Sequence, residues 1–196
     1  MRDIILTKEG TYSYTSRNDG ERTIQFLKQY IHSLHTRSIL DGTGCVGSDT
    51  ILFGLNCRIV HSIEYKNENW KALEHNVKLY SLNNIHLHQG DTTIIYKEYP
   101  SDIFYLDPPW GGPGYKRKKV LDLYLGDHRI DIFLRDSVLA KDSDWRPQWI
   151  ILKLPFNYNW VRLTTLHGLE TVHTLHIRNY RIVALKVSDP LTLDPS

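Results

Sequence analysis

The segment Asp107-Pro108-Pro109-Trp110 contains the residues of this sequence that are best suited to chemistry. It follows residues 103–106, a continuous apolar run typical of a parallel strand that is buried on both faces. Each proline fixes its own φ and lacks an N–H group, so the loop is rigid and its carbonyls have few local donors. A carboxylate beside such a carbonyl forms an acceptor pair for the two hydrogens of an amino group. This pair would hold an exocyclic amine in line with a methyl donor, by positioning and electrostatics.

The side chains of this segment divide the predicted work between them. Asp107 can take a proton once the amine gains positive character, and Trp110 offers a flat face on which a base can stack. We therefore predict catalytic roles for Asp107, Pro108 and Trp110. We predict substrate contacts from Pro109, Trp110 and Tyr115.

A glycine-rich turn, D-G-T-G-C-V-G at residues 41–47, lies between a predicted strand and a predicted helix. Its G-x-G-x-x-G spacing is typical of loops that approach a cofactor, and NAD-binding folds use it too. Asp41 at the strand end favours a cofactor with an ammonium group, which S-adenosylmethionine has and NAD lacks. Glu64, at the end of the next strand, can accept hydrogen bonds from two ribose hydroxyls. Asp91 can bond the adenine amino group or simply close a turn.

We therefore predict S-adenosylmethionine as the cofactor, with S-adenosylhomocysteine as its product. The residues predicted to bind it are Asp41, Gly42, Thr43, Gly44, Gly47, Glu64, Asp91 and Asp107.

Alternating strands and helices must position these residues. Hydrophobic periodicity predicts helices over residues 20–34, 67–82 and 127–141, and a helix ending near Leu55. It predicts strands over residues 38–41, 57–64, 85–88, 103–106 and 149–154, and a hairpin of 171–177 with 181–187 around Asn179. This order indicates βαβ units with a parallel sheet, in which ligands bind at the carboxyl ends of the strands. Four acidic residues lie at or just after predicted strand ends and should gather along that rim: Asp41, Glu64, Asp91 and Asp107.

Length and composition bound the remaining possibilities. The 196 residues suit a single domain, with residues 1–36 as an arm and helix and residues 37–196 as the core. No apolar stretch approaches the ~20 residues that a membrane span needs, and no signal peptide is evident. Two cysteines indicate a reducing compartment, so we expect an intracellular protein, nuclear or cytoplasmic, that is not secreted. The net charge of +2 does not itself indicate a nucleic-acid partner, and the oligomeric state is not predicted.

Two motifs carry a resemblance to a known family. Asp107-Pro108-Pro109-Trp110 resembles a motif of amino-methyltransferases that act on nucleic acids, and residues 107–115 together are similar to the trimethylguanosine synthases. These are class I, S-adenosylmethionine-dependent RNA cap guanine-N2 methyltransferases. Residues 12–15 (Y-S-Y-T), 41–47 and 151–155 also resemble this family, and the resemblance covers roughly residues 9–160.

The resemblance implies an α/β, Rossmann-like sheet of seven mostly parallel strands, with an antiparallel last strand and a short N-terminal helical arm. It implies that Thr15 approaches the cofactor and that Trp110 stacks on 7-methylguanine, whose positive charge adds a cation–π term of ~0.5–2 kcal/mol. The implied partner is capped RNA or a 7-methylguanosine nucleotide. The chain departs from the family at Asp107, where serine is frequent, and at Gly114, where an acidic residue is usual.

Weaker signals lie next to the two motifs. The basic run at residues 116–119 could contact the triphosphate of a cap or could be a solvated loop. Phe156 could wall the base pocket or pack in the core. We predict further substrate contacts from Lys116, Arg117, Phe156 and Asn157. His86 and His88 share one strand face without an evident third ligand, so we predict no metal site.

Two other functions remain possible at this stage. One is an amino-methyltransferase that acts on adenine or cytosine in DNA or RNA; Gly-Gly-Pro after the tryptophan favours the cap instead. The other is a non-catalytic, methyltransferase-like subunit that binds RNA or stabilises a partner. Asp41, Glu64 and Asp107 argue against it, because a scaffold does not need them.

Overall fold

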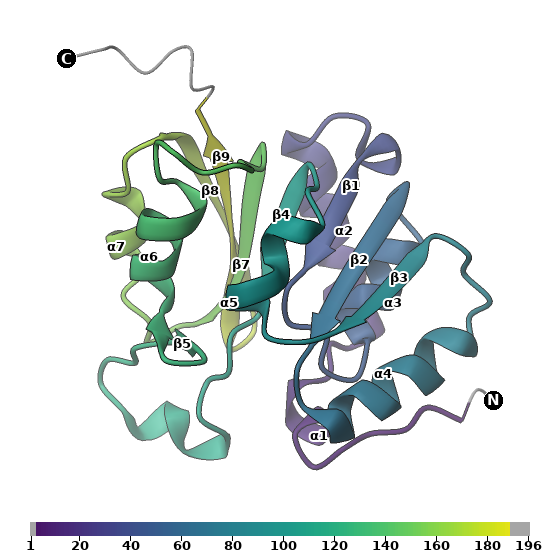
Figure 1. The fold of residues 1–196 in the computed structure, drawn as a ribbon. Coiled ribbons are helices and arrows are strands. Elements are labelled where there is room, and N and C mark those ends of the chain that lie inside the picture. The colour runs from purple at the N-terminus through teal and green to yellow at the C-terminus, as the bar shows by residue number, and fades with distance from the viewer. Residues whose placement is uncertain (1–2, 189–196) are drawn as a thin grey trace.

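A single seven-stranded sheet organises the computed structural model, which describes residues 3–188 (Figure 1). The strand order is β3-β2-β1-β4-β7-β9-β8. β1 to β4 and β7 run parallel, whereas β9 is antiparallel to both of its neighbours. The strands are β1 (Ser38–Asp41), β2 (Ile59–Glu64), β3 (Ile85–Gln89), β4 (Ile103–Leu106), β7 (Trp149–Pro155), β8 (Leu169–Ile177) and β9 (Tyr180–Val187). This topology confirms the mostly parallel sheet with an antiparallel last strand.

Helices cover both faces of this sheet. α2 and α3 pack against one face, where Leu27 and Phe53 meet Ile39. α6 and α7 pack against the other, where Phe133 contacts the cluster around Phe104. The helical elements are α1 (Gly10–Ser13), α2 (Arg17–Tyr30), η1 (Leu34–Thr36), α3 (Ser48–Gly54), α4 (Asn67–Lys78), α5 (Thr92–Ile95), η2 (Tyr96–Glu98), η3 (Pro113–Arg117), α6 (Ile130–Phe133), η4 (Leu134–Val138) and α7 (Val161–Thr164).

The central strand β4 shows why its sequence is apolar throughout. All four of its residues are buried, and they alternate between the two faces of the sheet. Ile103 and Tyr105 point towards α2, while Phe104 and Leu106 point towards α6. Each fully buried apolar side chain of this size contributes about 1.5–3 kcal/mol. The strand that ends at Asp107 is therefore held firmly from both sides.

Three helices differ from their predicted bounds, and one of them, α4, ends at Lys78 instead of residue 82. Another, α2, begins at Arg17, because the Ser16 side chain caps it by accepting a hydrogen bond from the Asp19 N–H at 3.2 Å. The predicted helix over residues 127–141 is interrupted at its start by a small hairpin of β5 (Tyr124–Leu125) and β6 (His128–Arg129). Gly126 forms the turn of this hairpin with a φ of 53°, so helix begins only at Ile130.

Residues 3–16, here called the arm, lie across α4 and the glycine turn. Asn76 is fully buried and bonds both backbone groups of Ile5, accepting from its N–H and donating to its carbonyl at 2.8 Å each. Thr7 donates to Asn69 at 2.7 Å, and Glu9 pairs with Lys66 at 2.7 Å. These polar contacts hold the arm beside the strand ends without a further strand.

None of the helices within residues 3–188 has the length and apolar character needed to cross a bilayer. Within the same residues, no group of three or more His, Cys, Asp or Glu side chains is arranged to hold a metal ion.

Candidate active site

The glycine turn after β1 and the Asp-Pro-Pro-Trp loop after β4 meet at the carboxyl ends of the parallel strands. In Figure 1 this rim is the lower edge of the sheet, towards which the arrow of β2 points and beside which α1 lies. The Gly42 N–H donates to the Tyr105 carbonyl at 2.9 Å, and the Asp107 N–H donates to the Thr43 hydroxyl at 2.7 Å. The two loops are therefore joined directly, as the strand order predicts.

The glycines of the turn are required by the protein's own packing. A Cβ on Gly42 would lie 2.7 Å from a Leu106 methyl carbon, and one on Gly44 would lie 2.5 Å from the Ser62 hydroxyl. Gly47 has a φ of 93°, a conformation that side chains rarely adopt. The turn thus lies flat against β2 and β4, and its residues can approach a ligand from the opposite side.

Asp41 lies behind this turn and has no exposed surface. Its carboxylate accepts a hydrogen bond from the Thr43 N–H at 3.0 Å and another from the Thr50 hydroxyl at 2.6 Å. Burial is the main cause that raises the pKa of Asp41 to about 7, with the Asp49 carboxylate adding to it. Asp41 is thus a buried carboxyl that shapes the turn, and its part in binding a cofactor ammonium stays a prediction.

Glu64 is the last residue of β2, and Asp91 comes shortly after β3, so both lie further along the rim. Glu64 accepts hydrogen bonds from the Cys45 N–H at 2.9 Å and the Lys66 N–H at 2.7 Å, so its carboxylate is fixed against the glycine turn. Burial raises its pKa, and these two bonds oppose the rise. Asp91 caps α5 by accepting from the Thr93 N–H at 2.8 Å through one oxygen. Both carboxylates keep lone pairs that can accept further bonds.

Lys153 is the site residue that the sequence analysis missed. Its ammonium is 2.8 Å from an oxygen of Asp107, 3.4 Å from Asp49 and 2.8 Å from the Thr15 hydroxyl. The lysine side chain is only 5% exposed and the Asp107 side chain 15%, so solvent screens this pair weakly. Burial is the main cause that raises the pKa of Asp107 to about 6, and Lys153 opposes that rise. Thr15 also meets the rim as expected, through this contact.

Trp110 is partly buried beside Asp107, and its indole ring is held by other aromatic rings. It packs edge-on to Tyr115, with ring centroids 5.1 Å apart, and lies 6.1 Å from the Tyr180 ring. Gly111 and Gly112 follow with φ of 83° and 72°, and a Cβ on either would meet open space. The positive φ of both residues, and not a lack of space, is therefore the reason for glycine at these two positions. This conformation turns the chain away from Trp110 and leaves the next segment exposed.

Two predicted substrate contacts have different surroundings. Asn157 uses its amide N–H groups on the Tyr115 and Lys118 carbonyls, at 2.8 and 2.9 Å. Its donors therefore anchor the loop that carries Tyr115, and its predicted contact with the ligand stays a prediction. Phe156 is 41% exposed, so it is not a core residue, and the Arg181 guanidinium lies over its ring at 5.5 Å.

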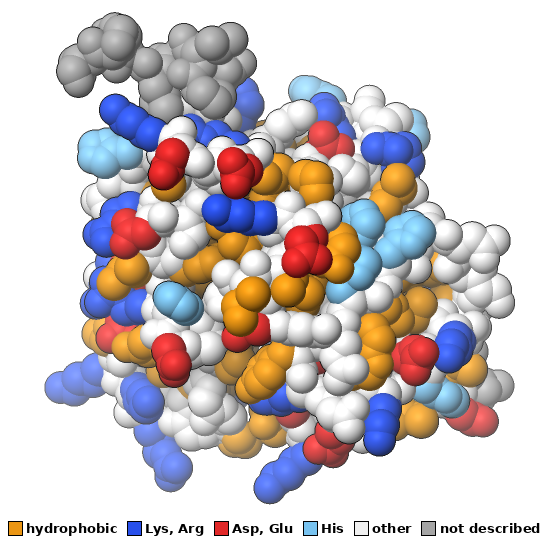
Figure 2. Space-filling view, in the orientation of Figure 1, with side chains coloured by type: hydrophobic (Ala, Val, Ile, Leu, Met, Phe, Trp, Pro, Cys, Tyr) orange, Lys and Arg blue, Asp and Glu red, His pale blue; other side chains and the backbone are white. Residues whose placement is uncertain are grey.

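The basic run from Lys116 to Lys119 is exposed and forms no ion pair with an acidic side chain of residues 3–188. In Figure 2, Lys and Arg side chains project from the lower margin of the molecule, the side on which the rim lies in Figure 1. Unpaired cations beside the Trp110 loop leave this margin open to phosphate groups.

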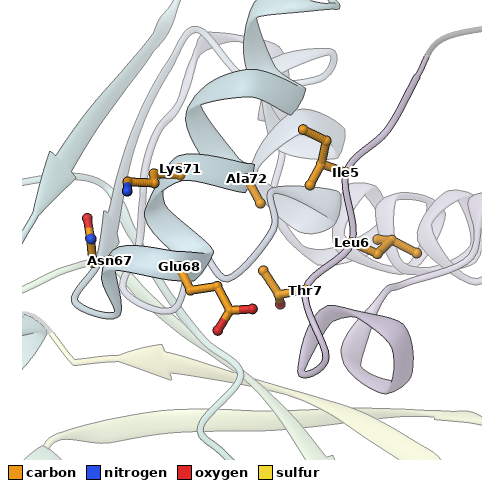
Figure 3. Close-up of a pocket in the computed structure, with 7 residues that line it drawn as sticks. All are labelled: Ile5, Leu6, Thr7, Asn67, Glu68, Lys71 and Ala72. Atoms are coloured by element: carbon orange, nitrogen blue, oxygen red, sulfur yellow. The ribbon is translucent and has the colours of Figure 1, made fainter.

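Two cavities formed by residues 3–188 lie away from Asp107. One of about 390 Å³ lies between the arm and α4 and is lined by Ile5, Leu6, Thr7, Asn67, Glu68, Lys71 and Ala72 (Figure 3). Another of about 350 Å³ lies between the segment around Tyr96 and the end of η4. Neither contains a residue that we predicted to bind substrate, so the candidate site is defined by its side chains.

The fold and the rim define a class I methyltransferase. The most informative structural likeness is to a 16S rRNA N2 methyltransferase from T. thermophilus, solved in complex with AdoMet and guanosine. Its TM-score is 0.66 at 15% identity, over 90% of this chain and 44% of that one. A precorrin-6y C5,15-methyltransferase from Geobacter metallireducens has a TM-score of 0.63 at 12% identity, over 95% of each chain. At these identities the likeness shows the fold alone.

The sequence comparison is more specific. A family described as RNA cap guanine-N2 methyltransferase matches residues 36–188, and the chain belongs to that family. It is 28% identical over 151 residues to the uncharacterized protein L320 of Acanthamoeba polyphaga mimivirus, covering 76% of this chain and 57% of that protein. It is 27% identical over 143 residues to the trimethylguanosine synthase of Schizosaccharomyces pombe, covering 68% and 58%. The chain thus spans a little over half the length of these relatives.

Proposed function

We propose that this chain transfers a methyl group from S-adenosylmethionine to the exocyclic 2-amino group of 7-methylguanosine in an RNA cap. The observation that carries the proposal is the Asp107 carboxylate, fixed 2.8 Å from the Lys153 ammonium and next to the partly exposed Trp110 indole. The family match over residues 36–188 supports it. Two findings thus support the proposal: a carboxylate placed to bind an amine, and membership of a family described as RNA cap guanine-N2 methyltransferase.

The rim fits a cofactor that carries positive charge. Asp41, Asp49, Glu64 and Asp107 bring four carboxylates together, and Lys153 is the cation that contacts two of them. S-adenosylmethionine would add a sulfonium and an ammonium against one carboxylate, and it supplies an activated methyl group when bound. Glu64 would bind the ribose hydroxyls of this cofactor, and Asp91 would bind its adenine amino group. Residues 42–47 would contact the rest of the cofactor. A net negative rim of low exposure strengthens such attraction, because the local dielectric is low.

The chain's own residues would act on the amine. Lys153 engages one oxygen of Asp107, and a hydrogen bond from Trp110 also lowers the pKa of this carboxyl; the remaining lone pairs of the carboxylate can accept one amine hydrogen. The Pro108 carbonyl would accept the second, and the Trp110 indole would support the purine ring. Because the pKa of Asp107 is about 6, most of this carboxyl is ionised at pH 7 and can hold the proton that the amine loses.

A substrate comparison tests this proposal. The protein is given radiolabelled S-adenosylmethionine with a 7-methylguanosine nucleotide, with an unmethylated guanosine nucleotide, or with uncapped RNA and DNA oligonucleotides. We expect label on the 7-methylguanosine nucleotide alone, at the 2-amino nitrogen, as shown by mass spectrometry of the isolated nucleoside.

The other outcomes would contradict the proposal in different ways. Label on uncapped oligonucleotides alone would assign the chain to adenine, cytosine or internal guanine methylation. Absence of transfer together with absence of cofactor binding in calorimetry would assign it a non-catalytic role. Equal transfer to both guanosine nucleotides would remove the need for the cation–π contact at Trp110.

A further inference from the structure

Lys153 is the one lysine whose ammonium is enclosed at the rim, and its contacts come from three separate segments. Thr15 belongs to the arm, Asp49 to α3 and Asp107 to the loop after β4. The side chain projects from β7, whose neighbouring residues Leu152 and Leu154 are fully buried. A lysine in such a strand is costly unless its charge is paired and its hydrogens are all engaged.

The geometry of this lysine satisfies that condition. An ammonium has three hydrogens, and Lys153 has three oxygen partners within 3.4 Å. The ring of Tyr180 lies 5.3 Å from the ammonium and closes the remaining side. Asp107 is the partner at ion-pair distance, with 2.8 Å from the ammonium nitrogen to one carboxylate oxygen.

We propose that Lys153 is a positioning residue that keeps Asp107 ionised and turned so that one carboxylate oxygen faces the substrate amine. This inference rests on the methyl-transfer function proposed above. Lys153 does not touch the amine: it occupies one oxygen of Asp107, whose carboxyl also has a hydrogen bond from Trp110, and it leaves the remaining lone pairs as acceptors. It also ties the arm and α3 to the same carboxylate, so the arm's position and the carboxylate's orientation are set together.

The surroundings of Asp107 show why a cation is needed there. The titratable and charged groups that face this carboxyl are Lys153 from β7, Asp49 from α3, Asp41 from β1, Tyr105 from β4 and Tyr180 from β9. Both tyrosines have raised pKa values and stay neutral, and the two aspartates repel a further negative charge. Without Lys153, burial and this repulsion would leave Asp107 protonated near pH 7, where it could donate but would accept poorly.

The trimethylguanosine synthases, which this sequence resembles, frequently have serine at the position of Asp107. This difference suggests an experiment with single and double variants of Asp107 and Lys153. Serine carries no charge, so a serine there needs no buried cation. Lys153→Met removes the ammonium and keeps an unbranched apolar chain. Asp107→Ser removes the carboxylate, and the double variant removes both charges. Lys186→Met is the control, because Lys186 also lies in the sheet but pairs with Glu170 at the surface.

Two measurements need no nucleic-acid substrate. Carbon-13 NMR of the aspartate carboxyls, with Asp107 assigned through Asp107→Ser, gives the pKa of Asp107 directly. We expect Lys153→Met to raise it by at least one pH unit and Lys186→Met to leave it unchanged. In thermal unfolding, we expect the Tm of Lys153→Met and that of Asp107→Ser to lie roughly 5–15 °C below the Tm of the wild type. The Tm of the double variant should be higher than that of either single variant.

A third measurement uses activity. In the profile of kcat against pH, the acidic limb should move to higher pH in Lys153→Met. In Lys153→Arg, which keeps the charge, the acidic limb should stay near its wild-type position. An unchanged carboxyl titration in Lys153→Met, or strictly additive losses in the double variant, would overturn the proposal and make Lys153 a packing residue. Because the titration and unfolding need no RNA, they decide the role of Lys153 even if the cap proves not to be the substrate.

Discussion

Asp41 gives the sharpest test of the electrostatics of the rim. In the absence of cofactor, the stability of Asp41→Asn relative to that of the wild type should increase as the pH rises. Burial raises the pKa of this carboxyl from 3.8 to about 7. A carboxyl whose pKa is raised by folding favours the folded state while it is protonated. Stability is therefore present below pH 3.8 and is lost as the pH rises towards 7. Asparagine does not titrate, so Asp41→Asn escapes this loss.

The magnitude follows from the two pKa values. Each pH unit between them costs about 1.4 kcal/mol, so the full loss reaches about 4 kcal/mol above pH 7. Between pH 5 and pH 8 the difference between variant and wild type should grow by roughly 2–3 kcal/mol, or roughly 5–10 °C in Tm. The amide can keep both contacts, because the Thr50 hydroxyl has Ser62 as a second partner at 2.9 Å and can reverse its direction.

Urea unfolding at pH 5 and pH 8 measures this difference. Asp136→Asn is the control, because the pKa of that exposed carboxyl is lowered by Arg135, which reverses the sign of any effect. Calorimetry at pH 8 should also show weaker S-adenosylmethionine binding by Asp41→Asn, because the amide lacks the charge that complements the cofactor. A stability difference that is the same at both pH values would refute the reasoning, since Asp41 would then not titrate in that range.

Three further predictions concern the loop after β4. Trp110→Ala should weaken binding of a 7-methylguanosine nucleotide about tenfold or more in a fluorescence titration, with S-adenosylmethionine affinity unchanged; equal loss of both would make Trp110 a purely structural residue. Gly112→Ala should cost ~1–2 kcal/mol in unfolding free energy because its φ is 72°, whereas Gly114→Ala, with no positive φ and room for a Cβ, should be nearly neutral. Replacing Lys118 and Lys119 with alanine should lower the salt dependence of RNA binding by about one counterion each, and an unchanged slope would leave them as solvated charges.

The sequence predicted those parts of the site that depend on local order along the chain. Asp41 and Glu64 end β1 and β2, Asp107 follows β4, and parallel strands bring their carboxyl ends to one edge whatever the details of packing. The hairpin near Asn179 was also predictable, because alternating residues flank a short polar turn; Arg178 there has a φ of 45°.

Lys153 could not be assigned from the sequence, because its meaning depends on contacts across the chain. It stands alone in the apolar run of β7, and its partner Thr15 is 138 positions away. The available signal was the lone charge in an otherwise buried strand, which needs a buried partner. The hydrogen bonds of Asn157 were unpredictable for a related reason: a side chain that reaches backbone carbonyls of another loop looks the same in sequence as one that reaches a ligand.

The position of β9 between β7 and β8 has a consequence for how the molecule assembles. During synthesis β7 emerges before its neighbour on that side, so it has an unpaired row of backbone groups until Tyr180–Val187 arrives. The half of the sheet formed by β1 to β4 can close earlier from contacts that are nearer in sequence. Chains cut short before Tyr180 should therefore retain the glycine turn but aggregate through the open β7 edge, so that β9 decides whether the half of the sheet that carries Lys153 becomes native.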